Sequence, residues 1–116
     1  LDMSLWDIAK NPVEQAHKDR SLLSFFTALP RGDVRLGVAG KIRDSATVQR
    51  LLDGGVDFAL IGRAAILHHD FPTRAMADAA FEAAKLPVSV GHLRNEGLGR
   101  AFVEYMSGWK GFVAQG

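Results

Sequence analysis

Arg35-Leu-Gly-Val-Ala-Gly-Lys-Ile42 is a short apolar run that ends in a glycine followed by a basic residue, and Phe58-Ala-Leu-Ile-Gly-Arg-Ala64 repeats this pattern. The segment between the two runs has helical spacing, with Val48, Leu51 and Leu52 as its expected buried stripe. The order is therefore strand, turn, helix, strand, turn. Because turns after neighbouring parallel strands lie at one edge of a sheet, we expect these two to form one anion-binding cradle.

The segments on either side favour the same architecture. Residues 2–6 alternate between polar and apolar residues, which predicts a short first strand. Apolar residues at 22, 25, 26 and 29 share one helical face. A helix of alanine-rich sequence is expected from Pro72 to Lys85 and another over residues 98–109. Residues 88–94 between them are expected to be irregular or a short turn. Asp44 is the expected N-cap of the central helix, and Gly54-Gly55 its stop.

This alternation of strands and helices predicts an α/β fold with a parallel sheet and right-handed crossovers. Three strands cannot close an eight-stranded barrel, which needs roughly 250 residues. Their open edges require either another polypeptide segment or a second copy of the chain. Since the sequence starts within an apparent strand, we expect residues 1–116 to be one incomplete TIM-barrel domain, namely the carboxy-terminal portion with about strands 6–8.

Composition excludes several kinds of protein. The 116 residues are 47% hydrophobic, which is ordinary for a globular domain, and carry a net charge of +1. Nothing therefore argues for nucleic acid or a membrane surface as a partner. Without cysteine, disulfides and thiolate chemistry are excluded. No signal peptide and no run of roughly 18 apolar residues are present, so we expect a cytoplasmic protein.

Gly40 and Gly62 are the candidate anion-binding glycines, because a backbone without a Cβ can approach an oxyanion closely. Lys41 and Arg63 add positive charge, and Arg63 can bond to a phosphate through two N–H groups at once. The alternative is that both glycines are ordinary turn residues and both basic side chains are solvated. Two such turns about 22 residues apart across one helix favour the cradle.

Other polar and aromatic residues are open to simpler interpretations. His68-His69-Asp70 lacks a third ligand at useful spacing, so we expect no metal site there. Asp57 lies at the start of its strand and is expected to be structural. Trp6 either lines a ligand pocket or belongs to the core. The apolar tail, with Trp109 and Phe112, either packs on the chain's own helices or forms a subunit interface.

Three motifs together resemble the final βαβ units of the old yellow enzyme family: Gly37-Val-Ala-Gly-Lys-Ile42, Leu51-Leu-Asp-Gly-Gly-Val-Asp57 and Leu60-Ile-Gly-Arg-Ala64. Met3-Ser-Leu-Trp6 resembles the sixth strand of that family, and the last residues are similar to the tail of some members. The resemblance thus covers most of the chain. It implies an FMN-dependent NAD(P)H:flavin oxidoreductase, of ene-reductase type, with a (β/α)₈ barrel.

The resemblance also implies roles for individual residues. Ala39, Gly40 and Lys41 after the seventh strand, and Gly62 and Arg63 after the eighth, would form the cradle for the FMN phosphate. Arg63 would grip the phosphate and lie against the flavin edge. Some family members have asparagine or methionine in place of Lys41, so a contact through the backbone alone would suffice there.

The family's groups for substrate oxygen, proton donation and the flavin pyrimidine ring come from its first five strands. This sequence has no counterpart of them, so we expect no catalytic residue here and an inactive isolated chain. With the missing amino-terminal barrel segment, the full enzyme would use NAD(P)H to reduce an activated alkene and would form a homo-oligomer. The redox chemistry belongs to the cofactor.

Two other functions are compatible with the same residues. The chain could be part of another phosphate-binding barrel, which would bind a sugar phosphate and no flavin. It could also be a non-catalytic half-barrel whose open strand edges make it an assembly module.

Overall fold

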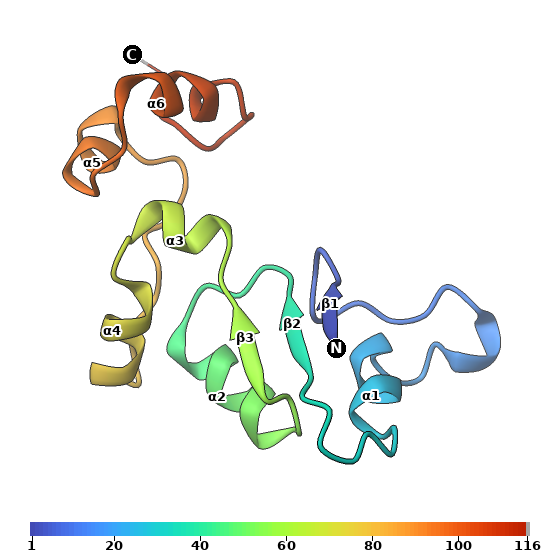
Figure 1. The fold of residues 1–116 in the computed structure, drawn as a ribbon. Helices are drawn as coiled ribbons and strands as arrows, with labels where there is room; N and C mark the ends of the chain where they lie inside the picture. The colour runs from blue at the N-terminus through green and yellow to red at the C-terminus, as the bar shows by residue number, and fades with distance from the viewer. Residues whose placement is uncertain (116) are drawn as a thin grey trace.

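A computed structural model describes residues 1–115 of the chain (Figure 1). The strands are β1 (Asp2–Ser4), β2 (Gly37–Ala39) and β3 (Phe58–Leu60), and they form a parallel sheet in the order β1-β2-β3. Asp2 pairs with Gly37, which pairs in turn with Phe58. The carboxyl ends of all three strands therefore lie at one edge, and the predicted parallel sheet is confirmed.

Helices make up most of the remaining regular structure. A 3-10 turn, η1, spans Gln15–His17, and six α-helices follow within the described residues: α1 (Leu22–Thr27), α2 (Ser45–Asp53), α3 (Arg63–Leu67), α4 (Phe71–Ala77), α5 (Val90–Asn95) and α6 (Arg100–Ser107). Figure 1 shows α1 and α2 beside the sheet, while α5 and α6 lie well away from it. Over residues 1–115, none of these helices combines the length and apolar character that crossing a membrane requires.

The central helix, α2, matches the prediction closely. The Asp44 carboxylate accepts the Thr47 N–H at 2.7 Å, and Gly54 ends the helix. Leu51 is buried, but Leu52 is 40% exposed, so the expected stripe is narrower than predicted. An N-cap of this kind typically stabilises a protein by about 0.5–2 kcal/mol.

The first helix is shorter than its sequence pattern. Pro30 has no N–H to donate to the Phe26 carbonyl, so the next helical hydrogen bond cannot form. The Arg31 guanidinium donates instead to the carbonyls of Phe26 and Thr27. α1 therefore ends at Thr27. Leu29 is left 49% exposed, while Leu23, outside the predicted stripe, is buried.

The expected helix from Pro72 to Lys85 is wrong in its extent. α4 ends at Ala77, because the Asp78 carboxylate accepts the Ala80 N–H and turns the chain. The following backbone pairs with the segment before α2 instead: Ser45 N–H donates to Phe81 and Ala83 N–H donates to Arg43. Tertiary pairing outweighs alanine's preference for helix at this point.

Residues 88–94 are expected to be irregular or a short turn, whereas the structure has the six-residue helix α5 over Val90–Asn95. The Ser89 hydroxyl accepts the His92 N–H at 3.0 Å and caps α5. Leu93 on this helix is fully buried. Val90 and Gly91 are weak helix formers, so packing of Leu93 decides the conformation.

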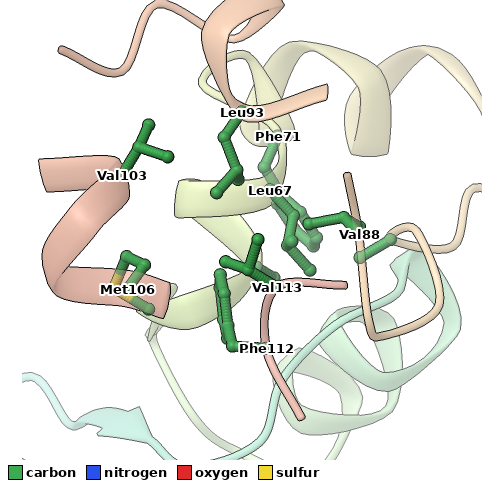
Figure 2. Packing of buried hydrophobic residues seen from close by; sticks show 10 residues of the cluster. Leu67, Phe71, Val88, Leu93, Val103, Met106, Phe112 and Val113 are labelled. Atoms are coloured by element: carbon green, nitrogen blue, oxygen red, sulfur yellow. The ribbon is translucent and has the colours of Figure 1, made fainter. Parts of the chain in front are cut away.

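Two hydrophobic clusters hold the chain together. The sheet cluster lies around β2 and contains Leu5, Leu23, Leu36, Val38, Ile42, Leu51 and Val56. The carboxy-terminal cluster, largely drawn in Figure 2, contains Ala64, Leu67, Phe71, Ala83, Val88, Leu93, Val103, Met106, Phe112 and Val113. Val48 and Ile61 pack against both. Phe112 and Val113 are thus buried within the chain, so the tail finds its partner surface there.

The molecule is more extended than a closed domain of its length. Its radius of gyration is 16.3 Å, whereas about 13 Å is expected for a compact domain of this size. Within residues 1–115, the outer edges of β1 and β3 have no strand beside them. Phe58 on β3 is 40% exposed, so this apolar strand is only partly covered by the described chain.

Candidate functional site

A cavity of about 430 Å³ lies at the carboxyl ends of the three strands. This is within the roughly 300–1,000 Å³ typical of small-molecule sites. Ser4 and Trp6 line it from the end of β1. The five predicted cradle residues line it as well, from the turns after β2 and β3: Ala39, Gly40, Lys41, Gly62 and Arg63. The fold therefore brings together every residue that the sequence assigned to the site.

The two glycines of the cradle differ in their surroundings. A Cβ on Gly40, whose φ is +149°, would meet backbone atoms of Trp6, Asp7 and Ile8 at 2.9–3.1 Å. Gly40 is therefore required by the packing of the chain itself. A Cβ on Gly62 would meet nothing within 4 Å. Since Gly62 lines the cavity, the space beside its backbone is open to a ligand.

Arg63 presents a guanidinium that no carboxylate neutralises among the described residues. It is half-buried, and its central carbon lies 5.0 Å from the centroid of the Trp6 ring. This is a cation–π arrangement. The cavity thus contains an unpaired positive charge that is held against an aromatic face.

Lys41 is held differently. Its Nζ atom lies 3.4 Å from Oδ2 of Asp7, and about half of the side chain is exposed. A hydrogen bond from the Ala9 backbone, together with Lys41, holds the pKa of Asp7 below its ordinary value of 3.8 despite some desolvation. Asp7 is therefore ionised near neutral pH and partly neutralises Lys41.

Two residues at the cavity have left-handed backbone conformations. Trp6 has a φ of 63° and Lys41 a φ of 52°. Non-glycine residues rarely adopt this region, and holding one there costs roughly 1–3 kcal/mol. Both sit in the turns that follow a strand, where they line the same cavity. Strained residues cluster at functional sites more often than elsewhere.

The helix after Gly62 contributes little to the positive potential of the site. α3 has only five residues, so few peptide dipoles add up at its start. The positive potential of this turn comes chiefly from Arg63.

Trp6 lies in the cavity wall and is 66% exposed, so its alternative interpretation as a core residue is wrong. Trp109 and Leu86 also line the cavity, although the sequence placed neither there. Trp109 follows α6 and reaches the site only through the packing of the carboxy-terminal cluster, which no local pattern reveals. Asp57 is structural as predicted, since its carboxylate accepts the Leu36 N–H at 2.7 Å.

A separate group of polar side chains lies between α3 and α5. One potential ligand atom from each of His68, His92 and Glu96 falls within 4.8 Å of the others. The sequence did not show this third partner, because Glu96 is 28 residues from His68. His68 is only 7% exposed, and its Nδ1 atom has no hydrogen-bond partner.

The hydrogen bonds around His68 argue against a metal ligand there. The Ala84 N–H donates to Nε2 at 2.8 Å, so that nitrogen carries the lone pair. In the neutral ring the proton must then be on Nδ1, which makes Nδ1 a donor and not a ligand. Burial lowers the pKa of His68 below 6.5, although Glu96 acts in the opposite direction.

Glu96 is held by its neighbours as well. Burial acts to raise the pKa of Glu96, but hydrogen bonds from the backbone and ring of His69 outweigh it and lower that pKa below 4.5. The His69 N–H and Nδ1 lie 2.9 and 2.7 Å from the same carboxylate oxygen. The group therefore joins the start of α4 to the end of α5.

A scan of protein-family models gave no match for this chain, nor did searches of curated proteins and of solved structures, so the resemblance to the old yellow enzyme family rests on the quoted motifs alone.

Proposed function

We propose that this chain supplies the phosphate-binding part of an FMN-dependent NAD(P)H oxidoreductase with a (β/α)₈ barrel. The observation that carries the proposal is that two turns, each a glycine followed by a basic residue, follow adjacent parallel strands and line one cavity. In barrels, the turns after the last two strands are a recurrent phosphate site. The motifs that resemble the old yellow enzyme family make FMN the favoured ligand.

The residues present fit a phosphate ester. Arg63 is an unpaired cation at the cavity wall, and the open space at Gly62 allows an oxyanion to approach the backbone. An Arg guanidinium donates two parallel N–H bonds to a phosphate, which also fixes its orientation. Ala39, Gly40 and Lys41 would close the other side of the cradle through their backbone, and Trp109 would flank the organic part of the ligand.

FMN, when bound, supplies the hydride chemistry by which such enzymes reduce activated alkenes. The role of this chain is to bind and orient the phosphate end and to exclude water from it. No residue of this chain is assigned a proton-transfer role, and a complete site requires the amino-terminal barrel strands. The extended shape and the open edges of β1 and β3 are consistent with such a complement.

The test is a titration of the chain with FMN, followed by quenching of flavin fluorescence, beside an absorbance spectrum of the freshly purified material. We expect flavin bands or saturable quenching that inorganic phosphate relieves. Binding of a sugar phosphate such as ribose 5-phosphate without flavin binding would indicate another phosphate-binding barrel. Self-association with binding of neither ligand would favour the assembly module, which the open strand edges support.

A further inference from the structure

The loop after β1 forms backbone hydrogen bonds with the turn after β2, and its Trp6 side chain contacts Arg63 in the turn after β3. Leu5 N–H donates to the Ala39 carbonyl at 2.9 Å, and Ile8 N–H donates to the Gly40 carbonyl at 3.1 Å. Between these two anchors lie Trp6 and Asp7. Their side chains contact the two cations of the cavity, one each.

The two contacts have opposite consequences for an incoming anion. Trp6 offers a ring face to Arg63, which leaves the N–H groups in the plane of the guanidinium able to donate. Asp7 offers a carboxylate to Lys41, which neutralises the ammonium and places a negative charge beside the cavity. A second hydrogen bond, from Ala9 N–H at 2.9 Å, fixes that carboxylate in place.

We infer that this loop makes Arg63, and not Lys41, the side chain that binds the ligand's phosphate. Trp6 is a positioning residue that holds the Arg63 guanidinium in the cavity. Asp7 pairs with Lys41 and so reduces the attraction of Lys41 for the anion. The inference rests on the proposed phosphate-binding function of the cavity. Trp6 therefore strengthens phosphate binding and Asp7 weakens it, although neither residue has a basic side chain.

The decisive experiment measures the affinity of the 116-residue chain for FMN and for inorganic phosphate in three variants. Trp6→Leu keeps an apolar side chain but removes the π-face, and we expect about two- to five-fold weaker binding. Trp6→Phe is the matched control and is expected to restore parental affinity. Asp7→Asn frees Lys41 and removes a negative charge, and we expect about two- to five-fold tighter binding that higher salt reduces.

Two further measurements separate positioning of Arg63 from direct contact between Trp6 and the ligand. In an Arg63→Ala background, Trp6→Leu should cause no additional loss of affinity; an undiminished loss would overturn the positioning role. In the ligand-free chain, NMR signals of the Arg63 side chain should be shifted upfield by the Trp6 ring. That shift should persist in Trp6→Phe and disappear in Trp6→Leu, and its absence from the parent would also overturn the inference.

The outcomes distinguish this inference from the proposed function. Flavin binding that is indifferent to Trp6→Leu and Asp7→Asn would refute the inference and leave the function standing. Phosphate binding with the expected dependence on both residues, but without FMN binding, would refute the flavin assignment and leave the inference standing. If the parent binds neither ligand, both are wrong.

Discussion

Gly40 and Gly62 give a direct comparison between a glycine that the fold needs and a glycine whose free space faces the cavity. We expect Gly62→Val to change the melting temperature much less than a substitution at Gly40, because a Cβ at Gly62 meets no atom within 4 Å. The same change should abolish saturable FMN binding by filling the approach to the backbone. Thermal unfolding and flavin titration on one preparation test both statements.

The matched control is Gly40→Ala. Its Cβ would collide with the backbone of residues 6–8, and its φ of +149° disfavours any side chain. We expect a destabilisation of roughly 1–3 kcal/mol with or without ligand. Flavin binding by Gly62→Val with parental affinity would disprove the cradle.

Arg63→Ala should weaken FMN binding by roughly 1.5–3 kcal/mol, the usual effect of removing a hydrogen bond to a charged group. Arg63→Lys keeps the charge but loses the two-pronged geometry, so an intermediate affinity is expected. Isothermal titration would give both values. Parental affinity in Arg63→Ala would mean that another group binds the phosphate.

At the level of the secondary-structure element, α2 depends on a cap that can be tested alone. Asp44→Ala should lower the free energy of unfolding by about 0.5–2 kcal/mol, because the Thr47 N–H loses its acceptor. Asp44→Ser retains a side-chain oxygen and should lose much less. Urea denaturation followed by circular dichroism measures the difference, and equal losses in both variants would exclude the cap as the cause.

The junction of α3 and α5 predicts a dependence of stability on pH. Because burial lowers the pKa of His68, the folded state favours the neutral ring, whereas the unfolded chain takes up a proton near pH 6.5. The stabilising contribution is therefore complete above about pH 6.5 and is lost as the pH falls through the lower pKa of the folded state. Urea midpoints measured from pH 7.5 to 5 should decrease accordingly.

His68→Gln provides the control for that measurement, since its amide oxygen can still accept a backbone N–H. Its stability should change less over the same pH range. The carboxylates of Asp44 and Glu96 have pKa values lowered from their ordinary 3.8 and 4.5, so their contribution to stability changes only at a lower pH than that of His68. An identical pH profile in both proteins would remove His68 as the cause.

Elements with strong local signals were predictable from the sequence, and those that depend on tertiary packing were not. α2 has a cap, an apolar stripe and a glycine stop in order, and the runs before Gly40 and Gly62 are apolar. These features placed the strands and five cavity residues. The end of α4 and the formation of α5 depend on backbone pairing with residues 43–45 and on burial of Leu93. Trp109 lines the cavity and Glu96 lies beside His68 only because of tertiary packing, so no local sequence pattern predicts either position.

At the scale of the whole molecule, the open sheet has a measurable consequence. We expect the isolated chain to self-associate, because parallel strands with uncovered edges and an exposed Phe58 are unfavourable in water. Sedimentation velocity across a hundred-fold range of concentration should show a rising average mass. A monomer at every concentration, with a radius of gyration near 16.3 Å by X-ray scattering, would show that the edges tolerate solvent.

The two hydrophobic clusters touch mainly through Val48 and Ile61, and the cavity wall is drawn from both: Ile42 belongs to one cluster, Ala64 and Leu67 to the other. A ligand bound in the cavity would contact residues of both clusters and so stabilise their relative position. Opening of either half would then require its release, so amide protons in α5 and α6, remote from β2, should exchange with deuterium more slowly once the cavity is filled.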